Sequence, residues 1–221
     1  QPNAAESTNM AQHLYTYGVI KQDDLELEVD GVDGADRIYT VDYRTLSAVV
    51  SDIDTTDPDR TDQNVQAHNA VLQEVLQYDG GRSVVPMSFG MAFKNARTLK
   101  GVMRGARRAL RSGLQDIDGT VELGVKVIGP EEHPVPEEVQ VSIADRLSAV
   151  SIGETDNDLF SDRLVLNKSY LVEREQRAAF DEAIDAIEEA HGETLRVQYT
   201  GPWAPYNFVD IHIGAGQQSE R

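Results

Sequence analysis

The segment from Tyr199 to Val209 constrains the fold more than any other part of the chain. It reads Tyr-Thr-Gly-Pro-Trp-Ala-Pro-Tyr-Asn-Phe-Val and holds the single tryptophan and two of the eight prolines. The prolines fix two φ angles and bias the residue before each toward extended backbone, while Gly201 permits backbone conformations that other residues avoid. The segment therefore predicts a rigid bend between two strands, and we expect its aromatic rings to fill a core at this corner.

Three separated motifs together resemble one protein family. They are the opening run Leu14–Ile20, the run Val84–Gly90 and, near the C-terminus, Gly-Pro-Trp-x-Pro-Tyr-x-Phe. Their order and spacing resemble the gas vesicle accessory proteins of the GvpF/GvpL family, and the resemblance extends from Met10 to about Gly214. We assign a structural role to the signature residues of the third motif, which are Gly201, Pro202, Trp203, Pro205, Tyr206 and Phe208.

Composition restricts where such a chain can work. Cysteine is absent, so no disulfide framework holds the fold. No apolar run reaches the ~20 residues that cross a bilayer, and the first residues lack the basic start and apolar stretch of a signal peptide. We expect a soluble protein of the cytoplasm. Gln1 to Asn9 reads as a remnant of cloning, with Met10 as the natural start.

The net charge is extreme. Asp and Glu number 38 against 20 Lys and Arg, which gives −18 over 221 residues. The acids are spread through periodic segments rather than gathered in a tail, which argues against a disordered acidic extension. At molar salt the Debye length falls to ~3 Å, so such self-repulsion is largely screened. The charge therefore indicates adaptation to a halophilic cytoplasm.

Strand and helix patterns alternate along the chain. β-rich runs predict strands at 13–20, 37–43, 46–53, 83–93, 120–128, 164–172, 195–199 and 209–213. Apolar residues at helical spacing predict helices at 62–78, at 95–114 with Asn95 as cap, around 143–150, and at 175–191. The two runs at 37–43 and 46–53 are separated by a short polar turn and predict a hairpin. The whole pattern predicts an α+β fold.

A composition break at 129–138 predicts a domain boundary. This segment contains three prolines and four glutamates, which suit an acidic, Pro-rich linker better than a core element. We therefore expect an N-terminal domain at 10–128 and a smaller C-terminal α+β domain at 139–221. The family resemblance implies a modified ferredoxin-like sheet in the first domain, and we expect both of its helices on one face.

The predicted helix at 95–114 is unusual because no acid occurs between Phe93 and Leu114. With Lys94 it carries seven cations, and the remaining 13 basic and 38 acidic residues give −25. Three interpretations stay open: a solvated face paired with Asp116 and Asp118, a docking face for an acidic partner or for the second domain, and a nucleic-acid site. High salt weakens phosphate contacts strongly, so we favour docking over nucleic acid. The candidate residues are Arg97, Lys100, Arg104, Arg107, Arg108 and Arg111.

Motifs of chemistry are weak, and we assign no catalytic residue, no cofactor and no metal. The acidic run Asp52–Asp59 lacks the glycine and the closing glutamate of a calcium loop. Asp210 and His212 share a strand face, but two ligands without a third make a poor metal site. We expect His68 and the other histidines to be satisfied core or surface groups. Gly101 and Gly105 are predicted to let their helix pack closely on a neighbour.

The resemblance implies a non-enzymatic role in gas vesicle formation. We expect the chain to bind the small hydrophobic shell protein and other accessory proteins during early assembly, in the cytoplasm and at the gas vesicle, without nucleic acid or membrane as partner. The docking candidates are the basic helix face and a sheet edge in the hairpin at 37–53. Two alternatives are a small α+β enzyme of unknown reaction and a halophilic interaction module unrelated to vesicles.

Overall fold

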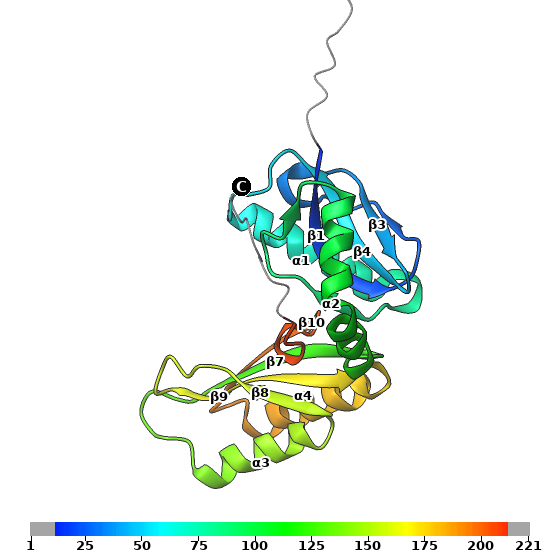
Figure 1. Cartoon of the computed structure of the whole chain (residues 1–221). Helices are drawn as coiled ribbons and strands as arrows, with labels where there is room; N and C mark the ends of the chain where they lie inside the picture. The colour runs from blue at the N-terminus through cyan, green and yellow to red at the C-terminus, as the bar shows by residue number, and fades with distance from the viewer. Residues whose placement is uncertain (1–11, 212–221) are drawn as a thin grey trace, which may run out of the picture. The chain divides into compact units, whose positions relative to one another are not determined.

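The computed structural model describes residues 12–211, so the predicted cloning remnant and His212 lie outside the described residues. The described chain divides into two compact units, whose elements are shown in Figure 1. Unit 1 comprises 12–74 and Pro86–Arg111, and unit 2 comprises Val75–Val85 and Ser112–Ile211. Sheets and helices occur in both units, which confirms the α+β class. Within 12–211, none of the helices has the length and apolar character needed to span a bilayer.

A six-stranded sheet carries the N-terminal half of the chain. Its strands run in the order β2-β3-β4-β1-β5, and β6 pairs with β1. β3 and β4 form the predicted hairpin, and its turn places Arg44 at φ +57°. The bounds are β1 (His13–Lys21), β2 (Glu26–Leu27), β3 (Ile38–Tyr43), β4 (Leu46–Ile53), β5 (Val84–Pro86) and β6 (Ala92–Phe93).

Two helices follow the predicted periodicity. α1 spans Asp62–Gln77 and buries the apolar positions that define its stripe, among them Val71 and Leu72. α2 spans Ala96–Asp116 and begins at the predicted cap, because the Asn95 Oδ1 accepts a hydrogen bond from the Thr98 N–H at 2.9 Å. Figure 1 shows α2 as one long continuous helix.

Both faces of the central strands are covered. Seven consecutive residues of β1, Leu14–Ile20, are buried, and so are six consecutive residues of β4, Leu46–Ser51. A strand with one solvated face alternates between buried and exposed residues. β1 and β4 show no such alternation over these stretches. The middle of this sheet is therefore buried on both faces.

Unit 2 contains a β-α-β-β-α-β arrangement. The strands β7 (Thr120–Ile128), β8 (Gly153–Asp156), β9 (Leu164–Glu173) and β10 (Arg196–Trp203) form an antiparallel sheet in the order β10-β7-β9-β8. α3 (Glu137–Ser148) connects β7 to β8, and α4 (Arg177–His191) connects β9 to β10. Each helix thus joins two strands across an intervening antiparallel one, which is the split β-α-β pattern of ferredoxin-like folds.

The helices of unit 2 pack on one face of this sheet. Val121, Leu123, Val125 and Val127 alternate along β7 and bury their side chains in a core with residues of both helices. That core includes Leu147 of α3, together with Phe180, Ile184 and Ile187 of α4. In Figure 1, α3 and α4 lie on the same side of the strands of unit 2. Neither of them covers the opposite face, which we call the helix-free face.

The predicted domain boundary at 129–138 is wrong. β7 precedes this segment and already belongs to the second sheet, and the division between the units falls at Arg111/Ser112, inside α2. The prolines and glutamates of 129–138 instead form the loop from β7 to α3, and the first turn of α3 begins within it at Glu137. Such composition marks a loop, but a loop inside a domain has the same composition as a linker between domains.

The predicted strand at 209–213 is also not found in the described residues. A 3-10 turn, η4 (Tyr206–Phe208), follows β10, and the chain continues to Ile211 without regular structure. β10 runs past its predicted end at Tyr199 to Trp203, and Pro205, which has no N–H to donate to a sheet, follows two residues later.

Candidate docking surface

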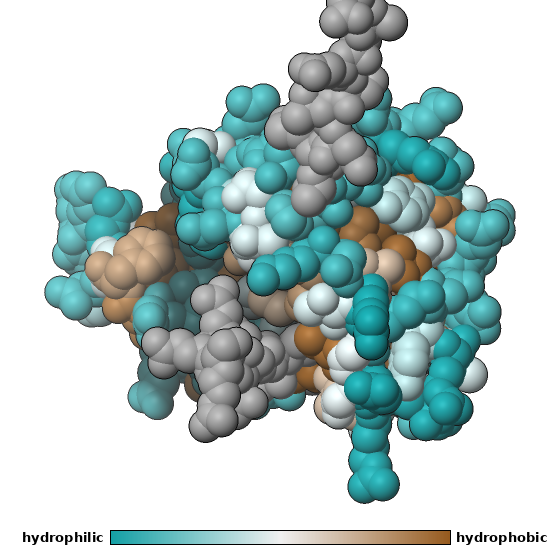
Figure 2. Space-filling view, turned by 45° about the horizontal axis from the view of Figure 1, so that its top comes forward, coloured by the Kyte–Doolittle hydropathy of each residue, from teal (hydrophilic) through white to brown (hydrophobic). Residues whose placement is uncertain are grey.

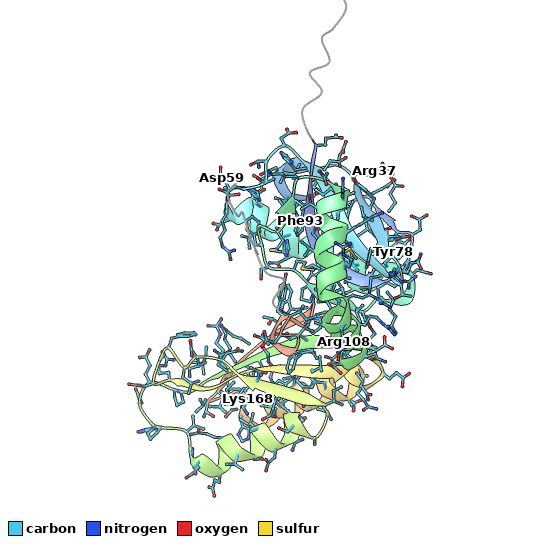
Figure 3. All side chains as sticks on the ribbon, in the orientation of Figure 1. Arg37, Asp59, Tyr78, Phe93, Arg108 and Lys168 are labelled. Carbon is cyan, nitrogen blue, oxygen red and sulfur yellow. The ribbon has the colours of Figure 1, made fainter. Side chains whose placement is uncertain are left out.

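The cations predicted for the helix at 95–114 lie on α2 or just before it, at exposed or half-buried positions. Leu99, Met103, Leu110 and Leu114 line one side of the helix and are at most 2% exposed. The cations Lys94, Arg97, Lys100, Arg104, Arg108 and Arg111 are exposed, and Arg107 is half-buried. Figure 3 labels Arg108 on α2, and Figure 2 shows how widely hydrophilic residues cover one face of the molecule. We call these seven cations the basic face.

No cation of the basic face forms an ion pair within the described part of the chain. Elsewhere the chain pairs its cations readily: Arg37 with Glu26 at 2.8 Å, and Lys168 with Glu154 at 2.7 Å. Of the expected local partners, the Asp118 carboxylate accepts a hydrogen bond from Ser83 Oγ at 3.3 Å. The cations of the basic face are therefore exposed or half-buried without an ion pair in residues 12–211, which leaves docking of an acidic partner open.

Gly101 and Gly105 do not support close internal packing, so this prediction is wrong. Both are exposed, and a Cβ added at either would meet no atom within 4 Å. A glycine inside a helix costs about 1 kcal/mol relative to alanine, and no contact within the protein offsets that cost here. Gly101 and Gly105 leave the backbone of α2 without side chains between the arginines, so another molecule can approach that backbone closely.

The aromatic corner does not fill the core as predicted. Trp203 is 36% exposed and Tyr206 is 40% exposed, whereas the small residue Ala204 between them is buried. The core of unit 2 holds the rings of Tyr170 and Phe180, whose centroids are 5.4 Å apart, and Tyr199 packs against it. The glycine of this motif is nonetheless required. Gly201 has φ +112°, its bond to Pro202 is cis, and a Cβ there would lie 2.8 Å from the Glu122 carbonyl oxygen.

Asn207 ties the aromatic corner to the sheet of unit 2 by hydrogen bonds, and the sequence did not predict this role. Its N–H donates to the Glu122 carboxylate at 3.0 Å, and its Nδ2 donates to the same carboxylate and to Ser169 Oγ. Glu122 is only 5% exposed, so these bonds satisfy a buried charge. The one signal in the sequence was a glutamate within the apolar alternation of β7, but its partner lies 85 residues away.

The first two motifs meet at His68. The Tyr15 hydroxyl donates to His68 Nδ1 at 2.8 Å and accepts from the Gly90 N–H at 3.1 Å. His68 Nε2 therefore carries the proton and donates to the Met87 carbonyl at 3.0 Å. Burial lowers the pKa of His68 to about 4 and raises the pKa of Tyr15. His68 is a satisfied core histidine, as predicted, and this network joins β1, α1 and the segment after β5.

A hollow of about 220 Å³ lies on the helix-free face of unit 2. Its lining includes five amide or hydroxyl side chains and the titratable residues Glu122, Lys126 and Lys168. The ion pair with Glu154 raises the pKa of Lys168. The strongly shifted groups Tyr15, His68, Tyr170 and Tyr199 all lie elsewhere, in packed cores. Within residues 12–211, no three His, Asp or Glu side chains come together as metal ligands would.

The fold and this surface define a class of protein: a two-unit α+β chain with an unpaired basic helix face on a strongly acidic background. A family model described as gas vesicle synthesis protein GvpL/GvpF matches residues 13–139 and 135–210. The chain belongs to the GvpL/GvpF family of gas vesicle proteins.

Curated relatives agree with this assignment. Gas vesicle protein F of Haloferax mediterranei is 73% identical over 213 residues, covering 96% of this chain and 100% of the relative. Gas vesicle protein F1 of Halobacterium salinarum is 69% identical, covering 95% of this chain and 98% of the relative. These relatives come from halophilic archaea, as the acidic composition predicts.

Solved structures confirm the fold. The crystal structure of gas vesicle protein GvpF from Anabaena superposes with a TM-score of 0.78 at 20% identity, covering 90% of this chain and 97% of that one. GvpF from Microcystis aeruginosa gives a TM-score of 0.76 at 19% identity, covering 90% and 99%. Since each match covers nearly the whole of both chains, the α+β architecture of the two units is that of GvpF.

Proposed function

We propose that the chain is a non-enzymatic accessory protein that binds other gas vesicle proteins during early vesicle assembly. Family membership supports a role in gas vesicle formation. The proposed partners are the small hydrophobic shell protein and companion accessory proteins, in the cytoplasm and on the growing vesicle. An apolar shell subunit is prone to aggregate before it assembles, and a highly charged partner can shield its exposed surface.

The basic face of α2 is the docking surface that we propose. The observation that carries it is the set of seven cations without an ion pair among the described residues, in a chain of net charge −18. Arginine forks bind carboxylates bidentately, which suits an acidic surface on the partner. The bare backbone at Gly101 and Gly105 supports the same proposal, because a partner can approach the helix axis there.

The alternative docking candidate, the sheet edge of the hairpin at 37–53, offers less surface. β4 is an interior strand between β3 and β1, and β2 covers β3 at Ile38 and Tyr39. Only the short stretch 40–43 of β3 remains as an edge in this hairpin, and Asp42 within it is exposed. Short, charged edges are poor templates for strand addition.

Binding rather than turnover also agrees with the titratable groups. Catalytic acids and bases have pKa values shifted by their site and lie in a cleft. Burial is the largest cause of the pKa shifts of His68, which lies between Tyr15 and the Met87 carbonyl, and of Tyr199, which hydrogen-bonds Asp181 on α4.

Co-purification tests the proposed function. We expect an affinity-tagged full chain, purified from vesicle-forming haloarchaeal cells in molar KCl, to retain the shell protein or a companion accessory protein. The same tag on an unrelated acidic protein is the control for non-specific retention. Recovery of the chain without any gas vesicle protein, from cells that are building vesicles, would refute the proposal.

A further inference from the structure

The helix-free face of the unit 2 sheet is organised in rows of side chains. Residues alternate between the two faces of a strand, so those between the core valines of β7 point to this face. The pairing of β10, β7 and β9 places three rows across it: Trp203–Glu122–Leu171, Thr200–Gly124–Ser169 and Gln198–Lys126–Asn167. The C-terminal turn η4 lies over the first row through the bonds from Asn207 to Glu122. We call the face beside it the open trough.

Gly124 lines a hollow in the middle of the trough. A Cβ at this position would lie 2.7 Å from Thr200 Oγ1, so the Thr200 side chain lies directly against the bare backbone and a larger residue would displace it. The hollow has a volume of about 220 Å³ and is floored by hydroxyl and amide groups. It is smaller than the ~300–1,000 Å³ of pockets for drug-sized ligands. A single inserted side chain suits it better than a small-molecule ligand.

Aromatic side chains bound the trough at both ends. Trp203, at 36% exposure, lies in the first row, and Phe160, at 75% exposure, lies 5.4 Å from Lys126 Nζ in the third. Glu122 and Lys126 are four residues apart on β7, so the two ends are separated by roughly 13 Å. Partly exposed aromatics around a recessed centre are the arrangement of interface anchors.

The charge of the trough differs from that of the protein. The stretch 195–209 carries no acid, although the chain has 38 acids among 221 residues. Arg196 and Lys126 have no carboxylate partner within the described residues, and the Glu122 carboxylate is held by Asn207. Glu122 is the one acid in the three rows and is held by Asn207, so the two cations without a carboxylate partner suit an acidic counterpart.

RNA does not fit this face, although ferredoxin-like sheets are used to bind it. RNA-recognition motifs stack bases on aromatic side chains of the sheet. The central strands β7 and β9 present Gly124, Lys126, Asn167 and Ser169 here, and none of these provides a stacking platform. A chain of net charge −18 also repels a polyanion.

We propose that the open trough docks an extended polypeptide segment of a partner protein. One apolar or aromatic side chain of the segment packs against Trp203, a neutral side chain enters the hollow beside Asn167 and Ser169, and a carboxylate pairs with Lys126 and Arg196. This surface is separate from the basic face of α2, and the proposal goes beyond the function proposed above.

Site-directed crosslinking tests this proposal, because the chain has no cysteine. Gln198→Cys places one thiol in the trough, and Glu188→Cys places one on the exposed side of α4 as the matched control. Each variant carries a benzophenone maleimide and is mixed in molar KCl with purified shell protein and companion accessory proteins. We expect one identified partner at Gln198→Cys, with at least tenfold less adduct at Glu188→Cys. The crosslinked peptide should hold an acidic residue within about four positions of a large apolar one.

Second-site variants decide the outcome. Lys126→Glu should reduce the Gln198→Cys adduct at least fivefold, while Arg104→Glu/Arg108→Glu on α2 should leave it within twofold. Circular dichroism establishes that each variant is folded, and Arg196→Glu replaces Lys126→Glu if that variant is not. Three results would each overturn docking in the open trough: no adduct at Gln198→Cys, equal adducts at the two cysteines, or an adduct that Lys126→Glu does not reduce. Co-purification through α2 can persist in each of these cases, so failure of the trough is distinguishable from failure of the proposed function.

Discussion

At the scale of single residues, His68 makes stability depend on pH. Its folded pKa of about 4 lies below the ordinary value of ~6.5, so the unfolded chain binds the extra proton first. The stabilisation is complete above pH ~6.5 and declines as the pH falls toward 4, by about 3 kcal/mol in total. Urea unfolding in molar KCl between pH 7.5 and 4.5 measures this decline. His68→Gln should lack that part of the slope, and an identical slope in the variant would contradict the assignment.

Asn207 should matter more to stability than its exposure suggests. Asn207→Ala removes the side-chain donor to Glu122 and leaves a buried carboxylate with fewer hydrogen bonds. We expect a loss of about 1–3 kcal/mol in unfolding free energy, measured by urea titration followed by circular dichroism. Gln198→Ala, at an exposed position of the same sheet face, should stay within about 0.5 kcal/mol. An unchanged unfolding free energy in Asn207→Ala would show that this side chain does not hold the aromatic corner in place.

These residues show which parts of the sites could be predicted from sequence. The cations of α2 are contiguous in one helix, so their common face could be predicted from helical periodicity alone. The Glu122–Asn207 contact joins residues 85 positions apart and could not. The exposure of Trp203 was predicted wrongly for the same reason, since whether a ring enters a core depends on which other residues pack there.

At the scale of elements, the two glycines of α2 separate a docking role from a structural one. Gly101→Ala and Gly105→Ala should each raise the unfolding free energy by about 1 kcal/mol, because alanine is the better helix former and neither Cβ meets an atom. The pair of substitutions should also weaken partner binding, because the added methyl groups keep a partner from the backbone. Urea unfolding and co-purification measure the two effects. A loss of stability would instead mean that the glycines serve the fold.

The elements were predicted better than their assembly. The first helix was expected at 62–78 and is found at Asp62–Gln77, and β9 was expected at 164–172 and is found at Leu164–Glu173. Periodicity is a local property and fixes such spans. The assignment of β7 to the first domain failed because strand pairing is not local: β7 pairs with β9 and β10, which come later in the chain.

At the scale of the whole molecule, salt should act in opposite directions on folding and on docking. The repulsion within a chain of net charge −18 is screened less as KCl falls from 1 M to 0.1 M. Over this range the Debye length grows from ~3 Å to ~10 Å. We expect the thermal midpoint to fall over this range through self-repulsion. Over the part of the range where the chain stays folded, association through the basic face should tighten. Thermal melts and binding titrations at matched salt check both signs, and a midpoint that rises on dilution would contradict the halophilic interpretation.

The affinity of the full chain for purified shell protein in molar KCl tests the central claim most directly. Arg104→Glu/Arg108→Glu reverses two exposed cations of the basic face, and Arg146→Glu on α3 is an exposed control away from it. We predict that the double reversal raises Kd about tenfold or more, while Arg146→Glu leaves it within about twofold. An unchanged Kd for Arg104→Glu/Arg108→Glu, in a variant that is still folded, would contradict docking through α2.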